Sequence, residues 1–295
     1  MLKRKIFYKN GVLIEDDCLN AMKTLKNNSV DLILCDLPYG TTNNAWDSII
    51  DFEILWSEYK RILKSNGAVV LFCQGVFTAK VILSNAEWFK YKIVWVKSKS
   101  TNFLNSRKQP LRQHEDICVF YKNQPIYNPV TEYGKPYFNQ RGKNVTTNYG
   151  VCKEGYNINP TGARFPTDTI YCEGQESEII PYRCHPTQKP INLGRYLIRT
   201  FTNQDAVVLD NACGSGSFLC SAILENRKFI GIEKNTSSER YIGVPSDYID
   251  LCDKRIKQHI KLLSEGFIFP DISSTLKNAI RPKLIKDAEN EYSHA

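Results

Sequence analysis

The sequence predicts an α/β fold, in which a largely parallel β-sheet is covered by helices on both faces. Runs of strand length alternate with helical patterns in the first 122 residues and again from about residue 191, an order typical of parallel sheets. These runs are mostly apolar throughout, as in strands buried on both faces. A chain of 295 residues can bury the core of one large domain that carries an inserted lobe.

The expected elements follow in order along the chain. The first half contains five expected strands, with helices at residues 51–64 and 76–89. These strands are residues 12–18, 30–35, 67–73, 92–97 and 116–122. The second half is expected to add helices at residues 191–202 and 217–226, and strands at residues 206–210 and 229–233, which makes seven strands.

Residues 123–182 break this alternation. They are rich in Asn, Gly, Pro, Thr and Tyr, and neither the helical nor the strand period continues through them. We therefore expect an insertion between residues 1–122 and residues 183–264, which would be the two halves of one domain. Residues 265–295 are polar and are expected to form a C-terminal tail.

The chain has a formal net charge of +8, and many of its basic residues lie in the middle of the sequence. Tyr, Phe, Asn and Gln residues are interleaved with them, as on surfaces that bind phosphates and contact bases. A solvated basic loop is the alternative interpretation. The candidate DNA-binding residues in this region are Arg107, Lys108, Arg112, Arg141 and Lys143.

Other features of the composition argue against several classes of protein. The apolar runs are far shorter than the roughly 18 residues of a membrane span, and the N-terminal segment lacks the apolar stretch of a signal peptide. The ten cysteines include no C-x-x-C pair, so no metal site is expected. Reduced thiols are typical of the cytosol, and we expect a cytoplasmic protein.

A carboxylate and an aromatic ring follow the expected strand at residues 30–35. The chain there reads Asp36-Leu37-Pro38-Tyr39. Open α/β sheets bind their ligands at the carboxyl ends of the strands, so these side chains are candidates for a functional site. A structural turn after a strand could have the same composition.

A glycine-containing turn follows the expected strand at residues 206–210. That strand ends in Asp210, and Gly214-Ser215-Gly216 leads into a helix; glycines let a ligand approach the backbone closely. The next strand ends in Glu233, whose carboxylate would suit the hydroxyls of a ribose. Leu219 stands where the G-x-G-x-x-G motif has its third glycine, which argues against an NAD-dependent oxidoreductase.

Together these segments resemble the β class of DNA amino-methyltransferases. Residues 36–39 are similar to the D-P-P-Y motif, and DNACGSGSF at residues 210–218 is similar to the D-x-F-x-G-x-G cofactor motif. RCHPTQKPINLGRYLIRTF at residues 183–201 resembles the H-P-T-Q-K-P segment that leads into the cofactor strand. The catalytic motif precedes the cofactor motif, which is the permuted order of this class. The resemblance covers roughly residues 12–256.

The resemblance implies a Rossmann-like, seven-stranded mixed sheet with one antiparallel strand, and S-adenosyl-L-methionine as the cofactor. The strand at residues 12–18 should lie beside the two late strands. The acid that faces the cofactor adenine is matched by Asp17, with Asp16 as a neighbouring competitor. His185 is as well explained by packing as by a role in the site. The implied cofactor-binding residues are Asp17, Asp36, His185, Thr187, Gln188, Lys189, Asp210, Cys213, Gly214, Ser215, Gly216 and Glu233.

The resemblance also assigns roles around the first motif. The exocyclic amine of adenine is a poor nucleophile because its lone pair is delocalised, and two hydrogen-bond acceptors favour its attack. Asp36 would supply one acceptor and the backbone carbonyl of Leu37 the other, with Pro38 restraining Leu37 to extended geometry. Tyr39 would stack on a base swung out of the duplex. Trp46 would either close the pocket or pack beside it.

A site-specific N6-adenine methyltransferase acting on double-stranded DNA is therefore the leading hypothesis. Cytosine N4 methylation is the alternative, although such enzymes more often carry Ser at the position of Asp36. Methylation of a protein glutamine would place the glycine turn first, and an inactive DNA-binding relic would not need both motifs intact. The recognition sequence, a homodimer and a cognate restriction endonuclease stay open. Residues 123–182 are the expected target-recognition region, and SSERYIGVP at residues 237–245 is an expected insertion.

Overall fold

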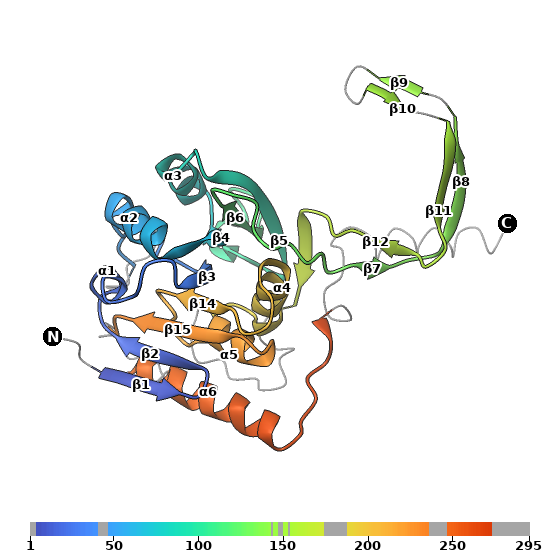
Figure 1. The fold of residues 1–295 in the computed structure, drawn as a ribbon. Coiled ribbons are helices and arrows are strands. Elements are labelled where there is room, and N and C mark those ends of the chain that lie inside the picture. Colours follow the sequence, from blue (N-terminus) through green and yellow to red (C-terminus); the bar gives the residue numbers. More distant parts are fainter. Residues whose placement is uncertain are drawn as a thin grey trace. The chain divides into compact units, whose positions relative to one another are not determined.

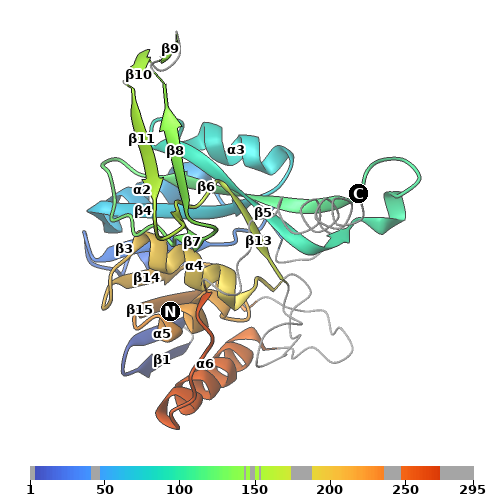
Figure 2. The same ribbon diagram turned by 90° about the vertical axis from the view of Figure 1, so that its right-hand side faces the viewer.

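The computed structural model describes residues 4–40, 47–142, 144–146, 150–152, 154–173, 188–235 and 247–272. The backbone divides into two compact units. The main unit comprises Met1–Asn128 and Asp168–Ala295, and the small unit comprises Pro129–Thr167. Figure 1 and Figure 2 show the elements of each unit.

A mixed sheet forms the centre of the main unit (Figure 1). Within the described residues it has nine strands, in the order β1-β2-β15-β14-β3-β4-β6-β5-β13. The strands are β1 Arg4–Tyr8, β2 Gly11–Glu15, β3 Val30–Cys35, β4 Leu63–Cys73, β5 Phe89–Thr101, β6 Arg112–Phe120, β13 Thr169–Cys172, β14 Val207–Asp210 and β15 Lys228–Glu233. The neighbours from β2 to β4 are parallel, whereas β6 is antiparallel to β4 and β5.

This sheet contains the seven expected strands in the implied arrangement. Strand β2 lies beside β15, and β15 lies beside β14, as the resemblance implied for the early strand and the two late ones. Strand β6 is the expected antiparallel strand. The predicted Rossmann-like α/β fold is therefore confirmed.

Two further strands extend the sheet, one at each edge. Strand β1 pairs antiparallel with β2 and alternates between half-buried and exposed residues. Strand β13 pairs parallel with β5 and falls inside residues 123–182, which were expected to form an insertion. Edge strands can be short and carry polar residues, so neither strand has the continuous apolar run that identified the other seven.

The described residues of the main unit form six α-helices and one short 3₁₀ helix. They are α1 Cys18–Met22, α2 Phe52–Ile62, α3 Val76–Ser84, α4 Ile191–Phe201, α5 Ser217–Leu224, α6 Tyr248–Ser264 and the 3₁₀ helix η1 Phe103–Asn105. Aspartates at Asp17, Asp51 and Asp247 cap α1, α2 and α6, because each carboxylate accepts a hydrogen bond from a backbone N–H in the first turn.

Helices cover both faces of the sheet. On one face, Ile33 and Cys35 of β3 belong to the same core cluster as Tyr59 of α2. On the other face, Phe72 of β4 stacks on Phe218 of α5, with 5.3 Å between ring centroids. Successive residues of a strand point to opposite faces, so strands enclosed in this way can be apolar throughout. This explains why periodicity identified the central strands.

The small unit is a run of antiparallel strand pairs. Among its described residues, β7 Glu132–Tyr133 pairs with β12 Ala163–Arg164, β8 Tyr137–Arg141 with β11 Gly155–Asn159, and β9 Asn144–Thr146 with β10 Gly150–Cys152. The pairs are nested along the chain, so they form one long hairpin (Figure 1). The rings of Phe138 and Tyr156 are diagonal neighbours across the β8–β11 pair, with 5.1 Å between ring centroids. These strands are short and largely polar, which explains why the sequence gives no clear period here.

No helix in the parts of the chain that the structure describes is long and apolar enough to cross a membrane. Eight of the cysteines within those parts are free thiols with buried side chains. Cys35, Cys73 and Cys118 belong to the core cluster. They pack there as small apolar side chains.

Candidate active site

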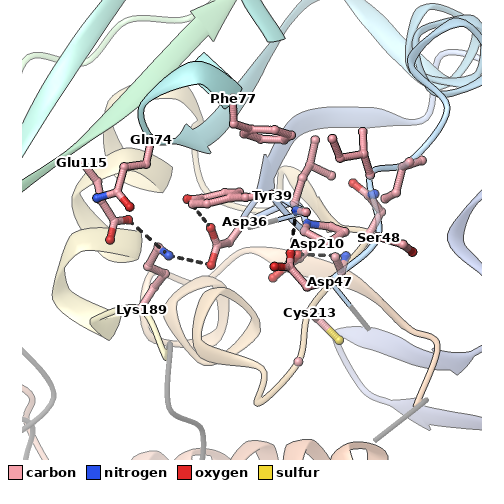
Figure 3. Close-up of a pocket in the computed structure, with 18 of the residues that line it drawn as sticks. Asp36, Tyr39, Asp47, Ser48, Gln74, Phe77, Glu115, Lys189, Asp210 and Cys213 are labelled. Atoms are coloured by element: carbon pink, nitrogen blue, oxygen red, sulfur yellow. Dashed lines mark hydrogen bonds and ion pairs between the residues drawn. The ribbon is translucent and has the colours of Figure 1, made fainter. Parts of the chain in front are cut away.

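A cavity of about 1110 Å³ lies at the carboxyl ends of β3, β14 and β15 (Figure 3). Because these strands are parallel and adjacent, the residues at their ends lie along one edge of the sheet. Both sequence motifs therefore line the same cavity. The candidate residues that line it are Asp17, Asp36, Leu37, Pro38, Tyr39, Arg112, Gln188, Lys189, Asp210, Cys213, Gly214, Ser215 and Glu233.

The Asp36 carboxylate is held by two donors in this cavity (Figure 3). The Tyr39 hydroxyl donates to Oδ1 at 2.8 Å, and Lys189 Nζ donates to Oδ2 at 2.6 Å. Burial raises the pKa of Asp36, and the positive charge of Lys189 opposes this rise. The donors fix the direction in which the carboxylate points, and each oxygen keeps a further acceptor site.

Glu115 of β6 shares Lys189 with Asp36. Lys189 Nζ lies 3.3 Å from Glu115 Oε2, and Lys97 Nζ of β5 donates to Glu115 Oε1 at 3.0 Å. Burial favours protonation of Glu115, but the two lysines outweigh it and hold its pKa below the ordinary value. Burial lowers the pKa of Lys189, yet Asp36 and Glu115 raise it overall, so this lysine stays protonated.

The four side chains of this network balance one another in charge. Two carboxylates alternate with two ammonium groups along the path from Asp36 through Lys189 and Glu115 to Lys97. The side chains of Lys189 and Glu115 are almost wholly buried. A buried charge is costly unless it is paired and hydrogen-bonded, and the pairing with Lys189 opposes the rise that burial causes in the pKa of Asp36.

The Tyr39 ring is stacked on Phe77 of α3 (Figure 3). The ring centroids are 4.8 Å apart and the planes are inclined by 28°. Lys189 Nζ lies 5.8 Å from the Tyr39 centroid. Burial raises the pKa of Tyr39, so its hydroxyl remains a hydrogen-bond donor to Asp36. Phe77 therefore fixes the plane of the aromatic ring beside the carboxylate.

The glycine turn and Glu233 form the other part of the cavity. Gly214 N–H donates to Glu233 Oε2 at 2.9 Å, and Asn235 N–H donates to Oε1 at the same distance. Gly214 has a φ of +48°, and no heavy atom would lie within 4 Å of a Cβ placed there. Burial raises the pKa of Glu233, and the backbone donors oppose the rise. The turn thus presents open space next to a positioned carboxylate.

Three acidic residues beside the turn are distinguished by the structure. Asp17 lines the cavity, where its Oδ2 lies 3.2 Å from Lys234 Nζ. Asp16 is absent from the described lining, and its side chain accepts from the Asp17 N–H instead. Asp210 lies at the base of the cavity, where burial raises its pKa to about 8. Of the two neighbouring aspartates, Asp17 therefore has access to a ligand in the cavity.

Gly216 has a different environment from Gly214. A Cβ at this position would lie 2.4 Å from Cys252 Sγ of α6, and its φ is +77°. Gly216 does not occur among the described residues that line the cavity. The local structure therefore requires glycine here for the turn and for packing against α6, rather than for space around a ligand.

The remaining candidates fall into three groups. Arg107 and Lys108 are exposed in the loop between β5 and β6, and neither is among the described lining residues. The structure describes Arg141 only as backbone at the end of β8. Four candidates lie outside the described residues, namely Trp46, Lys143, His185 and Thr187. The expected insertion at residues 237–245 also lies outside them.

Three residues that position the Asp36 carboxylate or the Tyr39 ring were not among the sequence candidates. Lys97, Glu115 and Phe77 line the cavity, and none of them belongs to a motif recognised in the sequence. Glu115 lies two residues before the apolar run of β6, and Phe77 is the second residue of α3. Their positions on elements that contact β4 were the available signal, since β4 is the neighbour of β3 in the sheet.

Comparisons with known proteins agree with this arrangement. The family model of N6/N4 methyltransferases, described as DNA methylase, matches residues 30–243. Type II methyltransferase M.HpaI of Haemophilus parainfluenzae is 27% identical over 93% of this chain and 91% of its own length. DNA adenine methyltransferase YhdJ of Escherichia coli K12 is 29% identical over 76% of this chain and 78% of its own length.

Solved structures share the fold. The M1.HpyAVI–SAM complex has a TM-score of 0.53 at 22% identity, over 83% of this chain and 98% of that chain. The cytosine-N4-specific PvuII DNA methyltransferase has a TM-score of 0.58 at 16% identity, over 87% of this chain and 97% of that chain. The family match spans most of the sequence and includes both motifs of the cavity, so the chain belongs to the N6/N4 DNA methylase family.

Proposed function

We propose that this protein transfers a methyl group from S-adenosyl-L-methionine to the N6 amino group of adenine in double-stranded DNA. The observation that supports this most strongly is the Asp36 carboxylate, which is oriented by Tyr39 and Lys189 in a cavity that the glycine turn also lines. A carboxylate acceptor beside an aromatic ring suits an exocyclic amine on a flipped base.

The residues around the turn fit the proposed cofactor. Glu233 and Asp17 offer carboxylates to hydroxyl and amino groups, and Gly214 leaves open space at the turn. Gln188 and Cys213 also line the cavity. The cofactor would supply an electrophilic methyl group on a sulfonium, while the protein's own residues bind and orient it. Positioning of this kind can account for much of the rate of a direct transfer.

Asp36 and Leu37 would activate the amine of the base. One carboxylate oxygen and the Leu37 carbonyl would each accept a hydrogen bond from the amino group, which frees the nitrogen lone pair for attack on the methyl carbon. The C–S bond breaks as the N–C bond forms, and the methylated amine then loses one proton. Burial raises the pKa of Asp36, so this carboxylate is suited to accept that proton.

Identification of the modified base tests the proposal. The purified protein would be incubated with S-adenosylmethionine carrying a labelled methyl group and with plasmid DNA, which would then be hydrolysed to nucleosides for mass spectrometry. Labelled N6-methyl-2′-deoxyadenosine from the DNA is the expected product. Binding of both ligands without any labelled nucleoside would instead indicate an inactive relic.

Cytosine N4 methylation is the second candidate, because the PvuII enzyme, cytosine-N4-specific by its title, shares the fold. Asp36 at the first position of the motif and the adenine methyltransferase YhdJ among the relatives favour adenine. The same digest distinguishes the two reactions. Labelled N4-methylcytosine without labelled methyladenine would establish the cytosine reaction.

The two glycines of the turn should respond differently to substitution. Gly214→Ala should weaken S-adenosylmethionine binding, because its Cβ would occupy open cavity space, with a stability loss of about 1–2 kcal/mol from the left-handed backbone. Gly216→Ala should lose more stability, because its Cβ would also meet Cys252 Sγ. Calorimetry and thermal melting separate these effects.

Gly266→Ala is the matched control for backbone strain. Its φ is +80°, its Cβ would meet nothing within 4 Å, and it is outside the described cavity lining. It should melt like Gly214→Ala while binding the cofactor like the parent. Equal cofactor affinity in Gly214→Ala and Gly266→Ala would contradict the role of the turn.

We also propose that the small unit reads the DNA target. Several of its aromatic side chains are exposed, including Tyr133, Phe138 and Tyr156. Asn139 and Asn157 are paired across its central hairpin, and their amide groups are exposed. Amides can pair with adenine edges in the major groove, and basic residues can bind phosphates.

Exchange of residues 129–167 for the matching segment of a relative with a known target should change the methylated sequence. Sequencing of the modified plasmid would reveal it, and an unchanged sequence would exclude recognition by this unit. In a second test, replacing Arg141 and Lys143 together with Ala should make the salt dependence of DNA binding less steep, by about 0.9 in slope per lost phosphate contact. Cofactor affinity should not change.

A further inference from the structure

The loop between β5 and β6 carries two exposed apolar side chains. Phe103 is 72% exposed and Leu104 is 86% exposed. They begin the 3₁₀ helix η1, which is the first element after β5. Figure 2 shows β5 and β6 running out to the loop that joins them. Large apolar groups at such a tip are costly to hydrate, and neighbouring groups of this kind mark interaction surfaces.

The turn that carries this pair is held by its own hydrogen bonds. Asn102 has a φ of +68°, and Asn105 Nδ2 donates to Asn102 Oδ1 at 2.7 Å. Backbone bonds continue the turn, with Ser106 N–H donating to the Phe103 carbonyl at 3.1 Å and Lys108 N–H to the Asn105 carbonyl at 2.8 Å. The two apolar side chains are thus presented outward by a structured turn.

The same loop begins and ends at the active-site cavity. The cavity that contains Asp36 is lined by Thr101 and Asn102 at the start of the loop and by Arg112 at its end. Arg112 Nη1 donates to Gln74 Oε1 at 2.6 Å, and Thr101 Oγ1 donates to the Arg112 carbonyl at 3.2 Å. The apolar pair therefore lies close in the chain to the place where a target base would enter.

Basic side chains flank the apolar pair. Lys99 precedes it, Arg107 and Lys108 follow it, and all three are exposed. A loop with an apolar tip and positively charged flanks is complementary to a DNA duplex, because the phosphates of the duplex are negative and its base stack is apolar. Known DNA-bending proteins insert Phe or Leu side chains between base steps in this way.

We propose that Phe103 and Leu104 form a wedge that enters the DNA base stack beside the target base and stabilises its flipped state. This inference rests on the proposed function, since it assumes that the protein methylates a flipped base. Flipping costs stacking and pairing energy. Apolar side chains in the gap would replace the lost stacking contacts, while the basic residues hold the phosphates on either side.

The test uses the Phe103→Ala, Leu104→Ala double variant of the full chain and short duplexes that carry the methylated sequence mapped on the plasmid. One duplex has 2-aminopurine at the target position, because its fluorescence rises when it leaves the stack. A second is fully paired, and a third has a mismatch opposite the target base. Flipping from the mismatch costs less, so it needs less help from a wedge.

The double variant should flip 2-aminopurine less and methylate the paired duplex at least about tenfold more slowly. A tenfold change corresponds to about 1.4 kcal/mol. Its rate on the mismatched duplex should equal that of the parent. Phe7→Ala is the matched control, because Phe7 is 76% exposed on β1 at the opposite edge of the sheet. It should behave as the parent does on both duplexes.

Other outcomes overturn the wedge in distinct ways. Equal loss on paired and mismatched duplexes, or a lowered melting temperature that explains the loss, would indicate a role in affinity or folding. A parent dimer that becomes a monomer in the variant would indicate an interface between copies. If the parent itself methylates neither duplex, the proposed function fails instead.

Discussion

Asp36→Ala is expected to lower the rate of methyl transfer by about 10²–10⁴-fold and to leave S-adenosylmethionine affinity close to that of the parent. The substitution removes the side-chain acceptor proposed for the amine, while the Leu37 carbonyl remains. Lys189 keeps its ion pair with Glu115 at 3.3 Å, so the loss of Asp36 does not leave this ammonium without a partner. The defect should therefore lie in the chemical step.

A pair of Asn variants, one directly after β3 and one within it, makes this test specific. Asp36→Asn keeps the shape of the side chain but replaces an acceptor oxygen with a donor, and it should be impaired like the Ala variant. Asp31→Asn makes the same change within β3. Asp31 forms an ion pair with Lys64, at 2.9 Å, and is not among the described residues that line the cavity. It should transfer methyl groups normally. Single-turnover rates, calorimetry and melting curves give the comparison, and near-normal turnover in folded Asp36→Asn would refute the acceptor role.

The central sheet could be predicted because its strands are enclosed. Residues such as Leu32 to Cys35 are wholly buried, so their apolar run is long enough to identify a strand without knowledge of its neighbours. The edge strands β1 and β13 are stabilised by pairing with β2 and β5. Such pairing depends on partners distant in sequence, and a local pattern does not contain it.

The two motifs could be predicted to meet, whereas the charge network between them could not. Asp36 and the turn follow the ends of parallel strands, and topology brings such ends together. Lys189, Glu115 and Lys97 meet only because of the register between β5 and β6 and the placement of the chain before α4. A lysine that pairs with a buried carboxylate and a lysine that faces DNA look alike in a sequence, so no local pattern identified Lys97 as part of the active site.

Gly214 and Gly216 show the same limit on a smaller scale. The sequence predicts a glycine turn and cannot distinguish a glycine that leaves room for a ligand from one that leaves room for a neighbouring helix. Gly216 approaches Cys252, which is contributed by α6 far along the chain. Only the packing of α6 against the turn separates the two positions.

Lys189→Met is the second change with a large expected effect. It removes the cation shared by Asp36 and Glu115, and Lys97 still holds Glu115 at 3.0 Å. Glu115 should therefore stay ionised, and Asp36 should take up a proton, because burial already raises its pKa and the opposing charge is gone. Removing one partner of a buried ion pair costs about 3–5 kcal/mol, so a lower melting temperature is expected as well.

The direction of the pH dependence separates this effect from simple loss of structure. A methyl acceptor bound by ionised Asp36 reacts only above the pKa of that carboxyl, so the acid limb of the rate profile should move to higher pH in Lys189→Met. Activity should partly return on the alkaline side. Stability should change in the opposite sense, because a carboxyl whose folded pKa is raised favours folding at low pH and loses that contribution as pH rises.

Two further variants complete the test of Lys189. Lys189→Arg keeps the positive charge and should keep the acid limb near that of the parent, even if its rate is lower. Lys64→Met removes a half-exposed ion pair with Asp31, which should cost no more than about 1 kcal/mol and leave the profile unchanged. If Lys189→Met lost activity equally at every pH, the lysine would act on structure alone. A shift of the acid limb of the rate profile, with cofactor affinity preserved, would instead show that Lys189 controls the ionisation of Asp36.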